Sequence, residues 1–287
     1  MERRLKESAY GYMEWLLNQY IHHTRRKVWE PLSEMFPLRQ EGYLMLIRIN
    51  KQHLILNEEM KREIGYFIKK HLIDTSSITF QVNGTENLLA VLALSGSRIE
   101  QEQITQIEEF IQNILVLEKN RIYFAVSSLY PDMESCGNKA YEEAMAAMKY
   151  SFYEEERYLQ AEKYLSDEKQ EDSVGSEAIL NSIKEGNLEK SEAIFEKITE
   201  VLSEHKSVQP DIFKRKIVFF FFRILRYMEP YLKAEHLSEL NALDNRLIES
   251  QWYSELKKRS AELIKNIIAF REIADSQETD PLDESRR

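Results

Sequence analysis

The sequence predicts an α+β protein: a domain with a mainly antiparallel central sheet and packed helices, flanked by an N-terminal helix and a C-terminal helical bundle. Three observations predict this fold. Apolar runs of strand length alternate with helical repeats between residues 42 and 150. Asn83-Gly84 separates two of these runs, and both residues tolerate the positive φ that a tight hairpin requires. After residue 176 the periodicity is helical throughout.

The first segment, residues 1–40, is predicted to be helical. Residues 3–23 place Leu5, Ala9, Tyr12 and Leu16 at four- and three-residue steps. This spacing favours an amphipathic helix packed on the rest of the protein, and it also fits a short coiled-coil seam. We interpret the histidines and basic residues at 22–27 as a solvated helix end, since adjacent histidines on a helix point in different directions.

The α+β domain is predicted to span residues 41–165. Its last long helix brings Ala140, Ala144 and Ala147 to one face, which allows a close approach to the sheet, and Tyr141, Met145 and Met148 are expected to fill the rim. We interpret this helix as core rather than as a site of chemistry. The predicted elements are a strand at 42–50, a helix at 58–72, strands at 77–82 and 87–94, a helix at 99–115, a strand at 121–127, a helix at 137–150 and a short strand at 157–159.

Composition and charge limit the class of protein. The 287 residues are enough for two domains, and the net charge of −10 argues against a chain that grips a phosphate backbone along its length. A single cysteine, Cys136, excludes a disulfide framework and fits a reducing cytoplasm. Four of the first six residues are charged, so no signal sequence is visible. Apolar runs such as 217–222 are far shorter than the roughly 20 residues of a membrane span. We expect a cytoplasmic protein with no membrane contact.

Motifs for chemistry are missing from the sequence. It contains no G-x-S-x-G, no phosphate-loop motif and no H-E-x-x-H. Cys136 has no histidine near it in sequence, and the glutamate pairs at 108–109 and 142–143 face different ways on their helices. We therefore predict no catalytic, cofactor-binding or metal-binding residues, no cofactor and no enzymatic activity.

One stretch carries a resemblance to a known family. Residues 125–159, AVSSLYPDMESCGNKAYEEAMAAMKYSFYEEERYL, contain the spacing AY-EA--A--Y, and residues 179–202, ILNSIKEGNLEKSEAIFEKITEVL, look like the paired helices that follow it in that family. Together with the element order and the Asn-Gly hairpin, residues 40–275 resemble the GGDEF or diguanylate-cyclase fold. They are more similar to the degenerate GGDEF-like version in YesN-type two-component response regulators of the AraC family. There it lies between a receiver domain and a helix-turn-helix domain.

The resemblance also implies which residues an active cyclase would need. The family's Gly-Gly-Asp/Glu-Glu-Phe hairpin holds GTP and a metal, and acids follow its first strand. Here residues 83–87 keep only Gly84 and Glu86, and the first strand ends with Arg48 and Asn50. Magnesium is usually held by one or two carboxylates plus substrate phosphates, so this hairpin would be a poor site. Cyclase activity is not expected.

The C-terminal half is predicted to be a helical bundle at 177–274, after a linker at 166–176. Gly186 is expected to end the first helix in a left-handed cap. An acidic tail at 275–287 is predicted to be disordered. The predicted helices are 179–185, 188–205, 211–230 and about 252–274.

The phenylalanine-rich helix at 211–230 supplies the candidate interface. One face holds the set Phe213, Ile217, Phe220, Phe221, Ile224 and Met228. A second face holds Phe219 and Phe222 between Arg215 and Arg226 at four- and three-residue steps, and it needs a cover of its own. The cover is either a second copy of the chain, in a homodimer that also uses helix 3–23, or the neighbouring helix 188–205 within one subunit. The dispersed basic residues are expected to lie over apolar surface rather than to bind nucleic acid.

Three functional hypotheses follow from the resemblance. The first is a non-catalytic signal-relay and dimerisation region of a bacterial transcriptional regulator, which joins a receiver domain to an AraC-type DNA-binding domain. Neither domain is visible in this sequence, and direct nucleic-acid binding is not expected. The alternative is a sensor that binds a nucleotide or another small molecule on the degenerate sheet, and a shift in melting temperature with such ligands would separate the two. An active cyclase is the least favoured.

Overall fold

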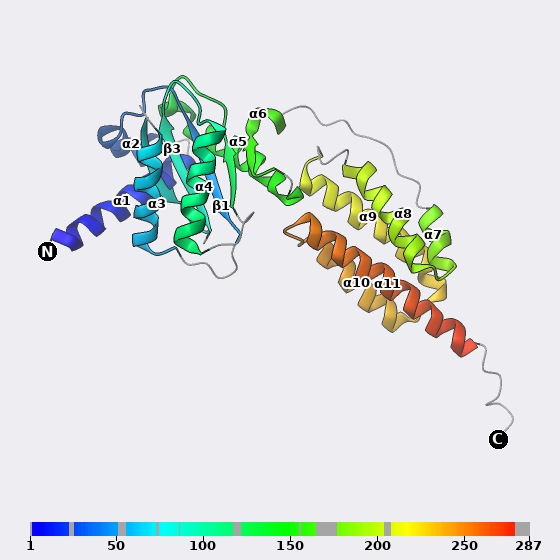
Figure 1. Ribbon diagram of the computed structural model, residues 1–287. Coiled ribbons are helices and arrows are strands. Elements are labelled where there is room, and N and C mark those ends of the chain that lie inside the picture. Colours follow the sequence, from blue (N-terminus) through cyan, green and yellow to red (C-terminus); the bar gives the residue numbers. More distant parts are fainter. Residues whose placement is uncertain are drawn as a thin grey trace. The chain divides into compact units, whose positions relative to one another are not determined.

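The computed structural model describes residues 2–22, 26–50, 56–72, 75–85, 87–116, 122–154, 156–164, 177–203 and 208–278. The chain forms two compact units (Figure 1). The first, which we call the α/β unit, comprises Met1–Ser151 and Glu155–Ser166. The second, the helical bundle, comprises Phe152–Glu154 and Asp167–Arg287.

A five-stranded mixed sheet forms the centre of the α/β unit. Three of its neighbouring pairs are antiparallel and only β4 and β5 run parallel, so the predicted mainly antiparallel sheet is confirmed. The strand order is β2-β3-β1-β4-β5, which leaves β2 at one edge. The strands are β1 (Gly42–Ile49), β2 (Ser76–Gln81), β3 (Leu88–Leu94), β4 (Ile122–Val126) and β5 (Tyr158–Gln160).

The predicted Asn-Gly hairpin is present between β2 and β3. Gly84 has a φ of 79°, in the left-handed region where glycine carries no steric penalty. The register pairs Gln81 with Leu89 and Ser76 with Leu94. Glu86, the one acidic residue that the cyclase pattern retains in the hairpin, lies outside the described residues.

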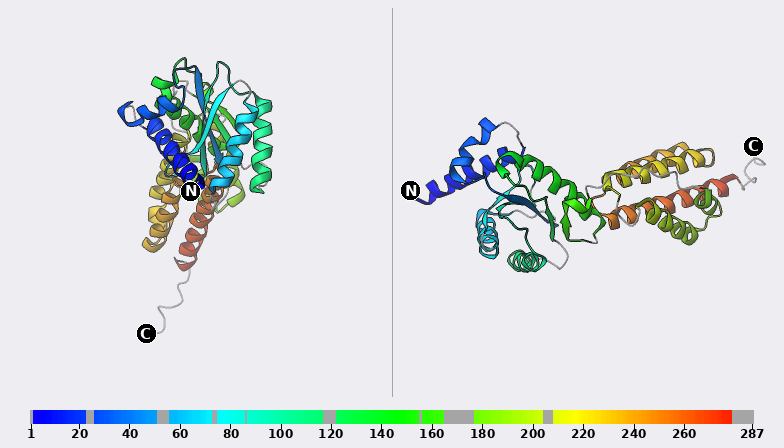
Figure 2. Two further views of the ribbon diagram at one scale, coloured as in Figure 1. Left: turned by 90° about the vertical axis from the view of Figure 1, so that its left-hand side faces the viewer. Right: turned by 90° about the horizontal axis from the view of Figure 1, so that it is seen from above.

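Helices cover both faces of this sheet (Figure 2). On one face α3 (Glu58–His71) and α4 (Gln101–Leu115) bury Ile64 and Ile107 against alternate residues of β1, such as Met45 and Ile47. On the other face α5 (Met133–Lys149) packs against β1 and β4. Because both faces are covered, the strands read as continuous apolar runs rather than as alternating ones.

Helix α5 begins four residues earlier than predicted. The side chain of Asp132 accepts a hydrogen bond from the Glu134 N–H at 3.0 Å and caps the first turn, which the apolar repeat did not reveal. The alanines at 140, 144 and 147 are fully buried, as predicted. Met148 is also fully buried, so it belongs to the core rather than to the rim that Tyr141 and Met145 occupy.

Two N-terminal helices complete the unit, α1 (Glu2–His22) and α2 (Arg26–Met35). Over residues 11–22 the prediction of an amphipathic packed helix is confirmed, because Leu16, Leu17 and Tyr20 are buried while Tyr12 and Trp15 are about half exposed. His22 makes an edge-on contact with Tyr141, with ring centroids 4.9 Å apart. Residues 23–25 of the basic cluster lie outside the described residues.

Among the described residues, the bundle contains the four helices that the sequence predicted and a fifth helix, α10, that was not predicted. Gly186, with a φ of 69°, follows α7 as the expected left-handed cap. Helix α11 continues to Glu278, so the first four residues of the predicted disordered tail are helical. No proline interrupts the helix before Pro281. The linker 166–176 and residues 279–287 lie outside the described residues. The bundle helices are α7 (Glu177–Lys184), α8 (Leu188–Ser203), α9 (Pro210–Met228), α10 (Ala234–Leu247) and α11 (Tyr253–Glu278).

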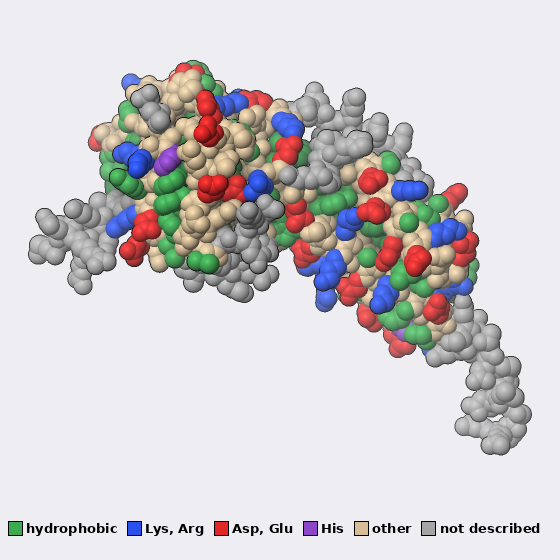
Figure 3. All heavy atoms as spheres, in the orientation of Figure 1, with side chains coloured by type: hydrophobic (Ala, Val, Ile, Leu, Met, Phe, Trp, Pro, Cys, Tyr) green, Lys and Arg blue, Asp and Glu red, His purple; other side chains and the backbone are tan. Residues whose placement is uncertain are grey.

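Short helical turns occur at η1 (Tyr150–Tyr153), α6 (Ala161–Tyr164) and η2 (Glu229–Tyr231). Among the helices in the described part of the chain, none is long and apolar enough to cross a membrane. On the face shown in Figure 3, acidic and basic side chains are interspersed on both units, and no broad basic patch appears there.

Candidate interaction surface

Helix α9 begins at Pro210, whose fixed φ and missing N–H suit the first helical turn. The face predicted to lie inside the bundle is buried along its whole length, from Phe213 to Met228. Part of its packing is aromatic, since the ring of Phe195 on α8 lies 6.1 Å from the ring of Phe220 and 5.4 Å from that of Phe221. This face therefore holds α9 in the bundle core.

The second predicted face of α9 lies in solvent. Phe219 is 63% exposed and Phe222 is 50% exposed, and Arg215 and Arg226 beside them are exposed as well. Helix α8 packs on Phe220 and Phe221 and leaves the second pair uncovered, so the expectation of a cover within one subunit is wrong for the described part of the chain. We call the stripe formed by Arg215, Phe219, Phe222 and Arg226 the α9 face.

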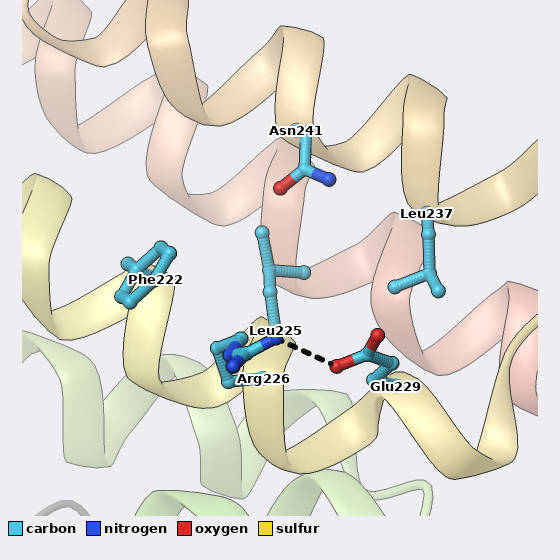
Figure 4. A pocket seen from close by; sticks show the side chains of 6 residues that line it. All are labelled: Phe222, Leu225, Arg226, Glu229, Leu237 and Asn241. Atoms are coloured by element: carbon cyan, nitrogen blue, oxygen red, sulfur yellow. Dashed lines mark hydrogen bonds and ion pairs between the residues drawn. The ribbon is translucent and has the colours of Figure 1, made fainter. Parts of the chain in front are cut away.

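A shallow pocket of about 200 Å³ adjoins the α9 face, between α9 and α10. Its apolar wall comes from Phe222, Leu225 and Leu237, and Asn241 closes it from α10 (Figure 4). Arg226 and Glu229 form an ion pair of 3.2 Å at the opening. An exposed aromatic ring beside an apolar hollow is the kind of surface that other proteins bind.

Charge on α9 is unevenly distributed and largely basic. In the described part of the chain, Arg215 and Arg223 form no ion pair, whereas Arg226 is held by Glu229. The Nζ of Lys214 lies 4.8 Å from the centroid of the Phe152 ring, which agrees with the expectation that basic side chains here lie over apolar surface. Two guanidinium groups without an ionic partner among the described residues thus lie beside the exposed phenylalanines.

The hairpin end of the sheet offers no comparable opening for a ligand among the described residues. Burial lowers the pKa of the Arg48 guanidinium below its usual value, and the side chain donates a hydrogen bond to the Ser151 hydroxyl at 3.2 Å. The Asn83 N–H donates to Asn18 Oδ1 at 2.8 Å, and the Gln81 N–H donates to Glu14 Oε1 at 2.7 Å. Helix α1 therefore occupies backbone donors next to the turn.

The two glutamate pairs diverge, as their spacing predicted. Glu108 is buried and pairs with Arg157; burial raises the pKa of its carboxyl, and Arg157 opposes that rise. Glu143 accepts a hydrogen bond from the Ser128 N–H at 3.1 Å, while Glu142 is exposed. Among the described residues, no group of three or more His, Cys, Asp and Glu side chains could hold a metal ion.

Buried polar groups in the bundle carried no clear signal in the sequence. Asp244 on α10 is only 5% exposed, and its Oδ1 has no hydrogen-bond partner among the described residues. Burial raises the pKa of its carboxyl to about 6. The hydroxyls of Ser250 and Ser260 are also buried without a partner in the described part of the chain. The only sequence signal was an aspartate between Leu243 and Leu247, where the repeat expects an apolar residue.

Comparison with known proteins adds no family to these observations. No protein-family model matches the chain, and no curated protein matches it.

Proposed function

We propose that this chain is a non-catalytic signal-relay and dimerisation region of a bacterial transcriptional regulator. It would couple an input domain to an AraC-type DNA-binding domain of the parent regulator. The observation that carries the proposal is the α9 face, where two large apolar side chains lie exposed side by side. Each phenylalanine gains roughly 1.5–3 kcal/mol when it is fully buried, so a partner that covers both gains appreciable free energy.

The partner in this proposal is a second copy of the chain. Homodimers are the commonest oligomers of soluble proteins, and a two-fold arrangement places attached domains at a fixed spacing. Helix α1 supplies a second contact, since Tyr12 and Trp15 are exposed on its surface and their rings stack 6.0 Å apart. A change in helix packing at either contact would alter the spacing of two attached DNA-binding domains.

Three features support a relay without catalysis. The half-buried Arg48 occupies the strand end where a cyclase needs acids, and α1 binds the backbone at the hairpin turn. The element order agrees with the resemblance to degenerate GGDEF-like domains. We expect no cyclic dinucleotide when the chain is incubated with GTP and Mg²⁺ or Mn²⁺, as measured by chromatography of the products. Product formation that Glu86→Ala abolishes would contradict this.

Sedimentation tests the dimer directly. The wild type is expected to sediment as a dimer, and the double variant Phe219→Glu, Phe222→Glu as a folded monomer, because burying two carboxylates at the contact is costly. The matched control is Tyr66→Glu, Val201→Glu, which changes two side chains that are 74% and 61% exposed elsewhere. The control is expected to remain a dimer. A wild type that stays monomeric at high concentration, or a double variant that stays dimeric, would reject the proposal.

A further inference from the structure

The orientation of the second copy can be derived from the bundle, and this step rests on the proposed dimer. Helices α9 and α10 form an antiparallel pair with one common outer face, joined by a short turn that contains η2. Two copies related by a two-fold axis can place these faces together in two ways. In one, α9 packs on the α9 of the partner. In the other, the axis runs along the groove between α9 and α10, and α9 packs on the partner's α10.

The first arrangement brings like charges together. An antiparallel pair of α9 helices centred on Phe219 and Phe222 places Arg215 level with the partner's Arg226. The exposed Arg223 and the half-buried Lys216 add further positive charge to the same contact. Like charges in close contact oppose association. Two carboxylates lie near that layer, Asp211 on α9 and Glu229 directly after it, and both already interact within the chain.

The second arrangement brings opposite charges to the same level. Across the pocket, Phe222 lies toward the same end as Asn241, and Glu229 lies toward the same end as Leu237 (Figure 4). Both helices rise 1.5 Å per residue, so the seven residues back from Phe222 to Arg215 match seven or eight residues forward from Asn241. That position is the exposed turn of Ile248 and Glu249, directly after α10. A two-fold axis that runs along the groove does not change the height of any residue along the helices. Arg215 of one copy therefore lies level with Glu249 of the other.

The outer side of α10 also has room for aromatic side chains. Its exposed residues next to the pocket are small or short, namely Ser238, Asn241, Ala242 and Asn245. Large side chains on one helix pack best against small ones on the facing helix. At the far end of this row Ile248 is 47% exposed and extends the apolar surface toward Arg215. In the described part of the chain, neither Arg215 nor Glu249 has an ionic partner of its own.

We propose that the α9 face binds the α10 helix of a second copy, with Phe219 and Phe222 on the row of small residues and Arg215 paired with the partner's Glu249. The two-fold axis makes this ion pair occur twice in each dimer. The contact is then a four-helix arrangement in which every α9 faces an α10. The α9–α9 contact that the stripe of phenylalanines alone would suggest is less favourable, because it places Arg215 level with the partner's Arg226.

A charge exchange separates the two arrangements. Arg215→Glu places two carboxylates opposite each other, and Glu249→Arg places two guanidinium groups opposite each other, so each single variant is expected to raise the dimer dissociation constant roughly tenfold. The double variant Arg215→Glu, Glu249→Arg restores the pair with its partners exchanged, and its dissociation constant is expected to return to near the wild-type value. Sedimentation equilibrium at low ionic strength measures all four proteins, since salt weakens exposed pairs.

Each outcome of this experiment decides between named alternatives. If α9 packed on α9, Arg215→Glu would meet the partner's Arg226 and tighten the dimer, and Glu249→Arg would change nothing. Either result overturns the inference but leaves the dimer proposal standing. A monomeric wild type rejects the dimer itself. Lys197→Glu is the matched control for Arg215→Glu, because it makes the same change in net charge at an exposed position on α8. It is expected to leave the dissociation constant unchanged.

Discussion

The α/β unit and the helical bundle treat their polar and apolar groups differently. In the α/β unit, α1 covers the hairpin end of the edge strand, and the alanines of α5 are fully buried. In the bundle, two phenylalanines lie exposed on α9 while a carboxyl and two hydroxyls lie buried without partners in the described residues. The α/β unit also exposes Tyr12 and Trp15 on α1 and holds one buried hydroxyl, that of Ser77, without a partner in the described residues, so the two units differ in degree. We assign the main partner contact to the bundle and a second contact to α1.

The close packing of α1 on α5 gives the largest expected effect. Gly137 on α5 touches the ring of Tyr20, and a Cβ there would overlap that ring. Tyr20 cannot move aside cheaply, because it is 1% exposed and its hydroxyl donates to the Met133 carbonyl. Gly137→Ala is therefore expected to lower the free energy of unfolding of the α/β unit by about 2–3 kcal/mol.

Gly11→Ala is the control for that variant. Gly11 lies inside α1, and a Cβ added there would meet no atom within 4 Å, so alanine should raise the stability of the unit by about 0.5–1 kcal/mol through helix propensity. Hydrogen exchange of peptides from β1 in both variants reports the free energy of opening. A rise in stability at both glycines would show that α1 is not tightly packed on α5, and would weaken the contrast between the units.

The buried carboxyl of the bundle gives a smaller effect that depends on pH. The pKa of Asp244 is about 6 in the folded chain, above the ordinary value of about 3.9. Well below pH 4 the carboxyl holds its proton in both states and its ionisation costs no stability. As pH rises to 6 and beyond, the unfolded chain ionises more easily, and the bundle loses up to about 3 kcal/mol. Asp244→Asn should recover about 1–2 kcal/mol at pH 8 and almost nothing at pH 4.

The gain in stability of Asp244→Asn is measured by denaturant unfolding, with hydrogen exchange of peptides from α11 reporting on the bundle. Glu239→Gln changes an exposed carboxylate on the same helix and should alter the stability by less than about 0.5 kcal/mol at either pH. An equal gain from Asp244→Asn at pH 8 and pH 4 would mean that the carboxyl is not held in an apolar site. The bundle would then be as well satisfied as the α/β unit.

Local sequence signals predicted most elements of the fold. The hairpin was read from Asn83-Gly84, because both residues tolerate positive φ, and the α5 contact was read from alanines at helical spacing. The same periodicity separated the buried face of α9 from the exposed pair Phe219 and Phe222. Element starts were less accurate, since the cap at Asp132 adds a polar turn that carries no apolar repeat.

Long-range contacts could not be predicted in this way. Phe222 and Asn241 line the same pocket, but Asn241 lies on α10, a helix that the apolar periodicity did not predict. The isolation of Asp244 depends on α10 packing against α11, and nothing local marks an aspartate as buried. The exposure of the α9 face was decided in the same way, by which side of α9 the helix α8 contacts.

The hydrogen bonds from α1 to β2 have a further consequence. Glu14 and Asn18 are one helical turn apart, about 6 Å along the axis. The backbone groups they bind belong to Gln81, the last residue of β2, and to Asn83 in the turn, a spacing of two residues or about 6.6 Å in extended chain. One turn of α1 therefore binds backbone groups at the end of β2 with nearly the spacing that a neighbouring strand would use. A chain that began after α1 would leave the end of β2 with unpaired N–H and C=O groups, ready to pair with another molecule. We therefore expect α1 to protect this end of the sheet edge from pairing with another molecule.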